Sequence, residues 1–157
     1  MNPYASFLDG RDALEIVAAT AERLRAAVLA LGPERVIRPL APGKWSVREV
    51  LSHLADSEIV FAFRLRQAQA EEHHVVQPMD QDIWARAYRA YDSESALDVF
   101  SAVRKWNVRF LSSLPATALD KRLTHPERGE MTYKVLLETM AGHDLHHVQQ
   151  LEKLAGQ

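Results

Sequence analysis

Residues 132–154 read TYKVLLETMAGHDLHHVQQLEKL, and their periodicity predicts a long amphipathic α-helix. Apolar side chains and two histidines recur at steps of three and four, the spacing of one helical face: Leu136, Met140, His143, His147, Leu151 and Leu154. The two histidines therefore replace apolar residues in the middle of a stripe that faces a core. A neutral imidazole is costly to bury unless its ring nitrogens find partners, so this pair calls for an explanation.

The spacing of His143 and His147 suits a metal ion. Residues at i and i+4 of a helix have Cβ atoms about 5–6 Å apart, and one divalent metal can then accept a nitrogen from each ring at about 2.0–2.1 Å. The alternative is a pair of core histidines bonded to buried carboxylates or carbonyls. His146 falls on a more polar face of the helix. Gly142 predicts the close approach of another element, because glycine inside a helix costs roughly 1 kcal/mol relative to alanine.

Length and composition predict a single globular domain spanning residues 1–157. Hydrophobic residues make up 47% and charged residues 25% of the 157 residues. A net charge of −2 gives no reason to expect a nucleic acid or an anionic membrane as partner. The absence of cysteine excludes disulfides, thiolate metal sites and a cysteine nucleophile. With no signal-peptide pattern and no apolar run of roughly 18 residues, a cytoplasmic location is the default expectation.

Three further segments have the helical period, and together with residues 132–154 they predict an all-α four-helix bundle. Gly-Pro ends the first segment, Ser46 and Glu49 form a capping box at the start of the second, and Pro115 stops the third. The segments are residues 12–31, 46–73 and 92–114. A short helix is expected near residues 82–88. The two longer connections allow a crossover, so the up-down order of the helices stays open.

A metal site needs a third ligand, and the candidates are His53, His73, His74 and His125. His53 is favoured, because it lies on a long buried helix and metal sites in bundles are built from facing helices. His73 and His74 fall in a polar stretch that predicts a solvated loop. His125 lies in a connection, where its side chain would be held less firmly.

Four segments resemble the DinB/YfiT-like superfamily, in particular its DinB-like metal-binding branch: KWSVREVLSHLADSE (44–58), DQDIW (80–84), THPERG (124–129) and AGHDLHHVQQL (141–151). The resemblance runs from about residue 45 to the C-terminus. It implies a four-helix bundle, usually dimeric, with one divalent metal, zinc or nickel, on three histidines. Carried over, the ligands are His53, His143 and His147. His146 stands where close relatives often have asparagine, and it could add a proton carrier near the site.

Three neutral histidines leave one or two coordination positions open, which is typical of a catalytic site. The open position would hold a water whose pKa falls towards about 7, or a thiolate. The resemblance therefore implies a small-molecule substrate and one of two reactions. These are metal-dependent hydrolysis, or transfer of an external low-molecular-weight thiol such as bacillithiol or mycothiol to an electrophile.

The acids nearest in sequence to the ligands are Asp56, Glu58 and Asp144. Asp56 and Asp144 could each accept an N–H from a ligand histidine, the support that such ligands usually need. The alternative is that these acids are surface charges of their helices. Because free histidines take up protons near pH 6.5, metal release is expected below about pH 6.

A different class of function also fits the sequence. The chain could be a non-catalytic, stress-related bundle in which the metal stabilises the fold or a partner interface. A homodimer is expected from apolar residues beyond what one core of this size needs: Ala62, Phe63, Trp84, Tyr88 and Tyr91.

Overall fold

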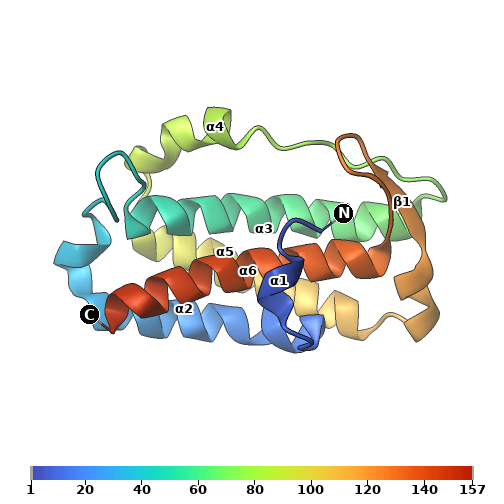
Figure 1. Ribbon diagram of the computed structural model, residues 1–157, viewed down its shortest axis with the longest axis horizontal. Helices are drawn as coiled ribbons and strands as arrows, with labels where there is room; N and C mark the ends of the chain where they lie inside the picture. Colours follow the sequence, from blue (N-terminus) through green and yellow to red (C-terminus); the bar gives the residue numbers. More distant parts are fainter. Residues whose placement is uncertain (1, 157) are drawn as a thin grey trace.

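The computed structural model describes residues 2–156, and long helices dominate it (Figure 1). In chain order the elements are α1 (Ala5–Leu8), α2 (Ala13–Val36), α3 (Val47–Ala70), α4 (Gln81–Trp84), the 3₁₀ helix η1 (Ala85–Ala90), α5 (Ser93–Ser112), the 3₁₀ helix η2 (Ala116–Asp120), β1 (Arg122–His125), β2 (Gly129–Thr132) and α6 (Tyr133–Ala155). The long helices α2, α3, α5 and α6 form the bundle, which confirms the predicted all-α four-helix class.

The long helices begin where the sequence predicts. At the start of α3 the Ser46 hydroxyl accepts the backbone N–H of Glu49, and the Glu49 carboxylate accepts the N–H of Ser46 at 2.8 Å, which completes the capping box. Asp92 and Thr132 cap α5 and α6 in the same way, through the backbone N–H groups three residues on.

The helix α2 differs from the prediction at its end. The sequence predicts a stop at Gly32-Pro33, whereas α2 continues to Val36 across a kink at Gly32 with φ 71° and ψ 166°. Glycine adopts this left-handed φ without a steric penalty. Pro33 then lies in the first turn of the continuing segment, where its missing N–H leaves no helical hydrogen bond unmade. The chain therefore breaks the helix at the predicted position and restarts it at once.

The order of the helices in space includes a crossover. The helix α2 packs mainly on α6, and α3 packs mainly on α5. Figure 1 shows that α3 and α5 run in the same direction, because the segment between them, residues 71–92, returns along the bundle and carries α4 and η1 over α3. The helix α6 also contacts α3. The bundle is thus not a simple up-down-up-down arrangement.

A short hairpin closes one end of the bundle, and the sequence does not predict it. The strands β1 and β2 pair antiparallel over four residues each, too few for a sustained alternation to be visible. The hairpin also holds the return segment, since Val76 donates to the carbonyl of Thr124 and Thr124 donates to the carbonyl of His74. His74 is buried there with its Nδ1 2.6 Å from Glu71, so the predicted solvated loop is wrong for His74 and right for His73.

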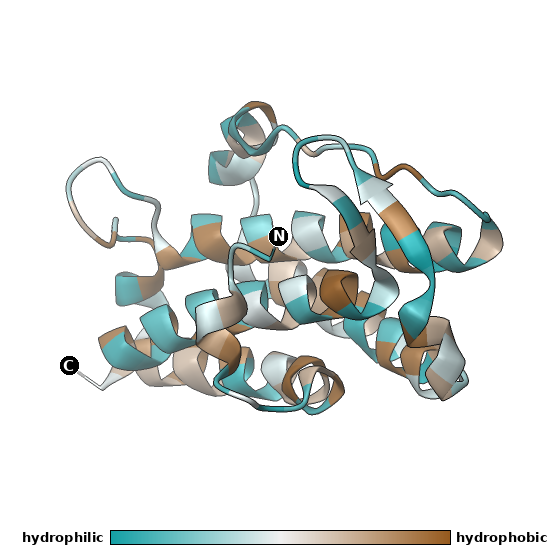
Figure 2. Ribbon diagram, turned by 45° about the vertical axis from the view of Figure 1, so that its right-hand side comes forward, coloured by the Kyte–Doolittle hydropathy of each residue, from teal (hydrophilic) through white to brown (hydrophobic). Residues whose placement is uncertain are grey.

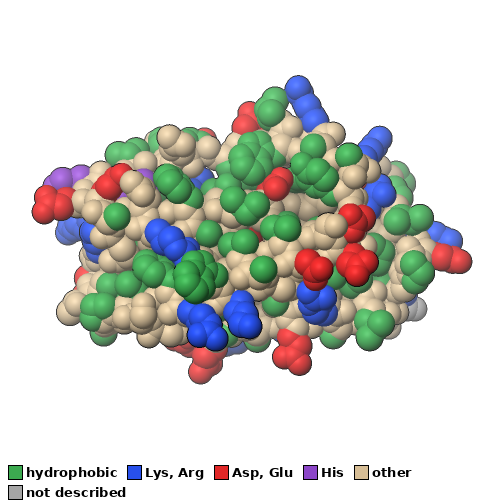
Figure 3. Space-filling view, turned by 180° about the vertical axis from the view of Figure 1, so that it is seen from behind, with side chains coloured by type: hydrophobic (Ala, Val, Ile, Leu, Met, Phe, Trp, Pro, Cys, Tyr) green, Lys and Arg blue, Asp and Glu red, His purple; other side chains and the backbone are tan. Residues whose placement is uncertain are grey.

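Hydrophilic and hydrophobic residues are interspersed along the long helices (Figure 2). On the face opposite the view of Figure 1, hydrophobic side chains lie among basic and acidic ones (Figure 3). Among the residues that motivate a homodimer, Phe63 is 55% exposed and Tyr91 45%, whereas Tyr88 is fully buried within the chain itself. The homodimer stays a prediction, and fewer exposed apolar residues support it because Tyr88 is buried.

No helix within residues 2–156 combines the length and the apolarity that a bilayer crossing needs.

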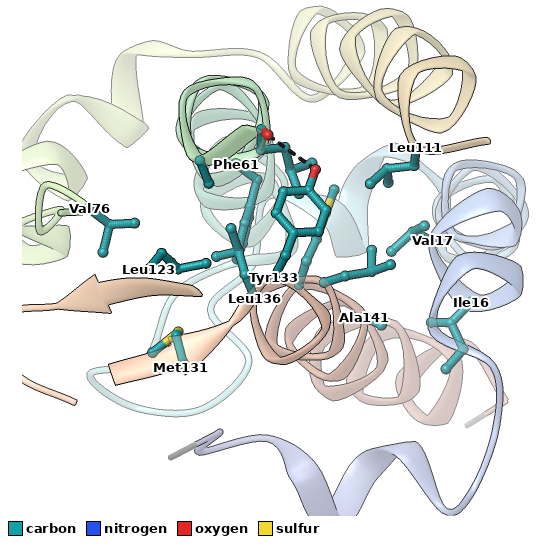
Figure 4. Packing of buried hydrophobic residues seen from close by; sticks show 14 of the residues in the cluster. Ile16, Val17, Phe61, Val76, Leu111, Leu123, Met131, Tyr133, Leu136 and Ala141 are labelled. Carbon is teal, nitrogen blue, oxygen red and sulfur yellow. Dashed lines mark hydrogen bonds between the residues drawn. The ribbon is translucent and has the colours of Figure 1, made fainter. Parts of the chain in front are cut away.

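The core divides along α6 into two clusters of buried side chains. The first surrounds Met140 and Leu145, and Figure 4 shows its part around Tyr133, whose hydroxyl donates to the carbonyl of Leu65 at 3.1 Å. The second contains Val148 and Leu151 of α6 with apolar residues of α2, α3 and α5. His143 and His147 lie on α6 at the boundary between the residues of the first cluster and those of the second.

Candidate metal centre

Three histidines from two helices converge between the core clusters. His53 of α3 and His143 and His147 of α6 each offer a ring nitrogen, and these nitrogens all lie within 4.8 Å of one another. The Nε2 atoms of His53 and His143 are 2.9 Å apart. All three side chains are buried, with exposed fractions of 4%, 7% and 8%. The structure thus brings together the three residues that the resemblance implies as ligands.

The geometry of this cluster fits a divalent cation. Two nitrogens bound to one ion at about 2.0–2.1 Å and at the tetrahedral angle are roughly 3.4 Å apart. The observed nitrogens lie around that separation, so small ring rotations would bring them to it. The Nδ1 atoms of His53 and His147 are buried and have no hydrogen-bond partner among residues 2–156. Buried nitrogens without a partner are costly. The ring nitrogens that face one another, among them Nε2 of His53 and of His143, are the atoms placed to bind an ion that accepts nitrogen ligands.

The surroundings keep all three imidazoles neutral. Burial is the largest cause, and it lowers the pKa of His53 to about 4 and that of His147 to about 3. The pKa of His143 is also held well below 6.5, first by burial and then by the positive charge that the other two rings would carry. Near pH 7 each ring therefore keeps a free lone pair, the form that a metal requires.

Glu58 and Asp144, two of the predicted supporting acids, bond to residues other than the three histidines. Both pair with the buried guanidinium of Arg104 on α5: Nη2 is 2.7 Å from Glu58, and Nη1 is 2.5 Å from Asp144. Thr20 also donates to Asp144, and the Asn107 amide donates to Glu58. The expected bond from a ligand histidine to Asp144 is not formed within residues 2–156. Arg104, which the sequence does not single out, takes that carboxylate instead.

Asp56 and His146 lie closer to the edge of the site. Asp56 is half-buried beside Tyr88, and burial raises the pKa of its carboxyl group. The ring of Tyr88, together with that of Trp45, packs against His53 at centroid distances of 6.4 Å and 5.2 Å. These aromatic rings restrict the rotation of the His53 imidazole. His146 is exposed, as the polar face of its helix predicts.

Two pockets adjoin the histidine cluster. The smaller, of about 140 Å³, has His143 in its wall together with Arg64 and His125. The larger, of about 440 Å³, has His146, His147 and Trp45 in its wall. Gln81 of α4 borders both. His125, the alternative third ligand, thus lies across the smaller pocket and not in the cluster.

The arrangement is that of a helical bundle with three buried histidines beside open pockets, and comparison with known proteins gives its family. The profile of the DinB superfamily matches residues 16–151. This chain belongs to the DinB superfamily.

Relatives and a solved structure agree with this assignment. A protein of Oceanobacillus iheyensis is 31% identical over 132 residues, which cover 83% of this chain and 77% of the relative. One of Bacillus cereus strain B4264 is 30% identical over 136 residues, 83% and 76% of the two chains. Both bear the name "Putative metal-dependent hydrolase". The structure of YfiT from Bacillus subtilis matches this chain with a TM-score of 0.83 at 22% identity, over 92% of this chain and 84% of YfiT, so the two share a fold. That structure is described as "a probable metal-dependent hydrolase with an unusual four-helix bundle topology".

Proposed function

We propose that this chain is a metal-dependent hydrolase of small molecules, in which His53, His143 and His147 bind one divalent cation, zinc or nickel. The observation that carries the proposal is the convergence of three buried, neutral imidazoles next to a pocket. A closed structural site would leave no such access. The names of the relatives support the hydrolase class.

Within this proposal the protein holds and shields the reacting groups. A bound divalent cation supplies Lewis acidity and lowers the pKa of a coordinated water. Phe61, Met131 and Leu136 give the smaller pocket an apolar wall, which limits competing water around a substrate. His146 borders the larger pocket beside His147, and its side chain is exposed there.

Thiol transfer is a second proposal, and the observation in its favour is the second pocket. A transfer between two small molecules needs two binding places, and the cluster has one pocket on the side of His143 and another on the side of His147. Incubation of the zinc- or nickel-loaded chain with ester and amide panels, and separately with a low-molecular-weight thiol plus an electrophile, distinguishes the two reactions.

Metal analysis of variants tests the site itself. Replacing His53, His143 or His147 with alanine should release most of the metal, because two histidines hold the ion far more weakly than three. His146→Ala and His73→Ala are the matched controls, since both side chains are exposed, and they should retain it. The proposal fails if the wild-type chain binds none of zinc, nickel, manganese or iron. It also fails if His53→Ala keeps full occupancy while His125→Ala loses it.

A further inference from the structure

The smaller pocket has a basic end that the proposed metal site does not use. Arg64 of α3, His125 of β1 and Arg128 of the hairpin turn border this pocket together with His143. Glu127 is the acidic residue among the described residues that line it. Two arginines and one glutamate therefore border the same small space, so the formal charge of the residues at this end of the pocket is positive.

Arg64 is held in place while part of its guanidinium lacks a partner. Its Nη2 donates to the backbone carbonyl of Gln77 at 2.5 Å, which ties it to the return segment. Its Nε is buried and has no hydrogen-bond partner among residues 2–156. Burial and the nearby Arg128 lower the pKa of Arg64, yet arginine stays charged in proteins. A buried, charged N–H without an acceptor is unfavourable, and an anion would relieve it.

His125 supplies a neutral donor at the same end of the pocket. Its Nδ1 accepts the backbone N–H of Glu127 at 3.2 Å, so in the neutral ring the proton lies on Nε2. Burial and the two arginines lower the pKa of His125 and keep the ring neutral near pH 7. The side chain is buried in the pocket wall. Its Nε2–H is thus a hydrogen-bond donor next to a fixed positive charge.

We propose that this end of the pocket binds the carboxylate of a small monoanionic substrate, with Arg64 as the ion partner and His125 Nε2–H as a hydrogen-bond donor. One net positive charge matches one carboxylate better than a dianionic phosphate. A pocket of about 140 Å³ with Phe61, Met131 and Leu136 in its wall accommodates a short hydrocarbon chain next to the carboxylate. Where the hydrolase proposal also holds, the scissile bond of that substrate lies on the side of His143.

Propionate binding to the metal-free full-length chain tests the subsite without any contribution from a metal. We expect calorimetry or NMR titration to show binding to the wild type, and Arg64→Gln and His125→Phe each to weaken it roughly tenfold or more, the usual effect of losing a charge-assisted hydrogen bond or leaving a buried charge unpaired. Arg122→Gln is the control, because this arginine lies on the same hairpin with an exposed side chain. If Arg64→Gln does not fold, as judged by circular dichroism, the propionate affinities of Arg64→Lys and His125→Phe are compared with that of the wild type instead.

Three results would overturn the subsite: absence of propionate binding to the wild type, unchanged affinity in the folded Arg64 and His125 variants, or tighter binding of inorganic phosphate than of propionate. On the metal-loaded chain, a monoaryl ester of succinate should be cleaved in preference to its methyl diester, and Arg64→Gln should reduce that preference while Arg122→Gln keeps it. Arg64-dependent propionate binding without cleavage of either ester would support the subsite and count against the hydrolase.

Discussion

Gly142 lies where α1 approaches α6, one residue before His143. A Cβ at this position would be 2.6 Å from both the Cβ and the carbonyl oxygen of Tyr4, which confirms the predicted close approach of another element. The ring of Tyr4 in turn packs edge-on against His143 at 5.4 Å and borders the smaller pocket. The absence of a side chain at residue 142 therefore allows α1 to cover one side of the histidine cluster.

Gly142→Ala should displace α1 without unfolding the bundle. Overpacking costs about 1–3 kcal/mol, part of which is offset by the roughly 1 kcal/mol that alanine adds to helix propensity. Because α1 has only four residues, detaching it is the easier response. Hydrogen exchange of residues 2–10 should become faster. Gly156→Ala, whose added Cβ would meet nothing closer than 3.6 Å, is the control, and unchanged protection in Gly142→Ala would contradict the expectation.

At the scale of elements, one buried arginine connects the four long helices. Arg104 of α5 bonds to Glu58 of α3, to Asp144 of α6 and to the backbone carbonyl of Val17 in α2. Two carboxylates and one guanidinium are buried here, and burial raises the pKa of Asp144 against the opposing effect of Arg104. The network fixes the rotation of α6, which carries His143 and His147 in the same turns as Asp144.

Arg104→Met should destabilise the fold by about 3–5 kcal/mol, because it leaves two buried carboxylates without a cation. Denaturant unfolding at pH 7 measures the change in free energy. Arg25→Met is the matched control, because it breaks an ion pair between Arg25 and Asp98, whose side chains are 50% and 65% exposed. It should lower the free energy of unfolding by less than about 1 kcal/mol. Equal losses in the two variants would show that the buried network does not have the expected role.

For the whole molecule, the histidine cluster makes stability depend on pH. The pKa values of His53 and His147 fall to about 4 and about 3 in the folded chain, against about 6.5 when unfolded. Between these values the unfolded chain binds more protons than the folded one, so the free energy of unfolding decreases as the pH falls from about 6.5 towards 4. The same shifts move the expected release of metal to a lower pH than the value near 6 that free histidines suggest.

Unfolding of the metal-free chain by denaturant at pH 7 and at pH 5 measures this dependence. We expect a loss on the order of a few kcal/mol for the cluster. His53→Phe should reduce the loss, because it removes one group that the unfolded chain protonates. His73→Ala should leave the loss unchanged, since its side chain is exposed. Stability that is the same at both pH values would contradict the lowered pKa values.

The sequence by itself determined the features that arise within one helix. The starts at Ser46, Asp92 and Thr132, the pairing of His143 with His147 and the need for glycine at residue 142 follow from capping, periodicity and helix propensity, which act over a few residues. The position of His53 on a long buried helix made it the favoured third ligand, and the family resemblance implied the same residue.

Only the tertiary structure decided which distant residues meet. It placed His53 against His143 across 90 residues of sequence, turned Glu58 and Asp144 towards Arg104, and buried His74 beneath the hairpin that the sequence does not predict. It also brought Arg64 and His125 to one pocket. Each of these contacts depends on how whole helices, the hairpin or the return segment pack against one another. Such contacts join segments far apart in the chain, and the local patterns of side chains carry no record of them.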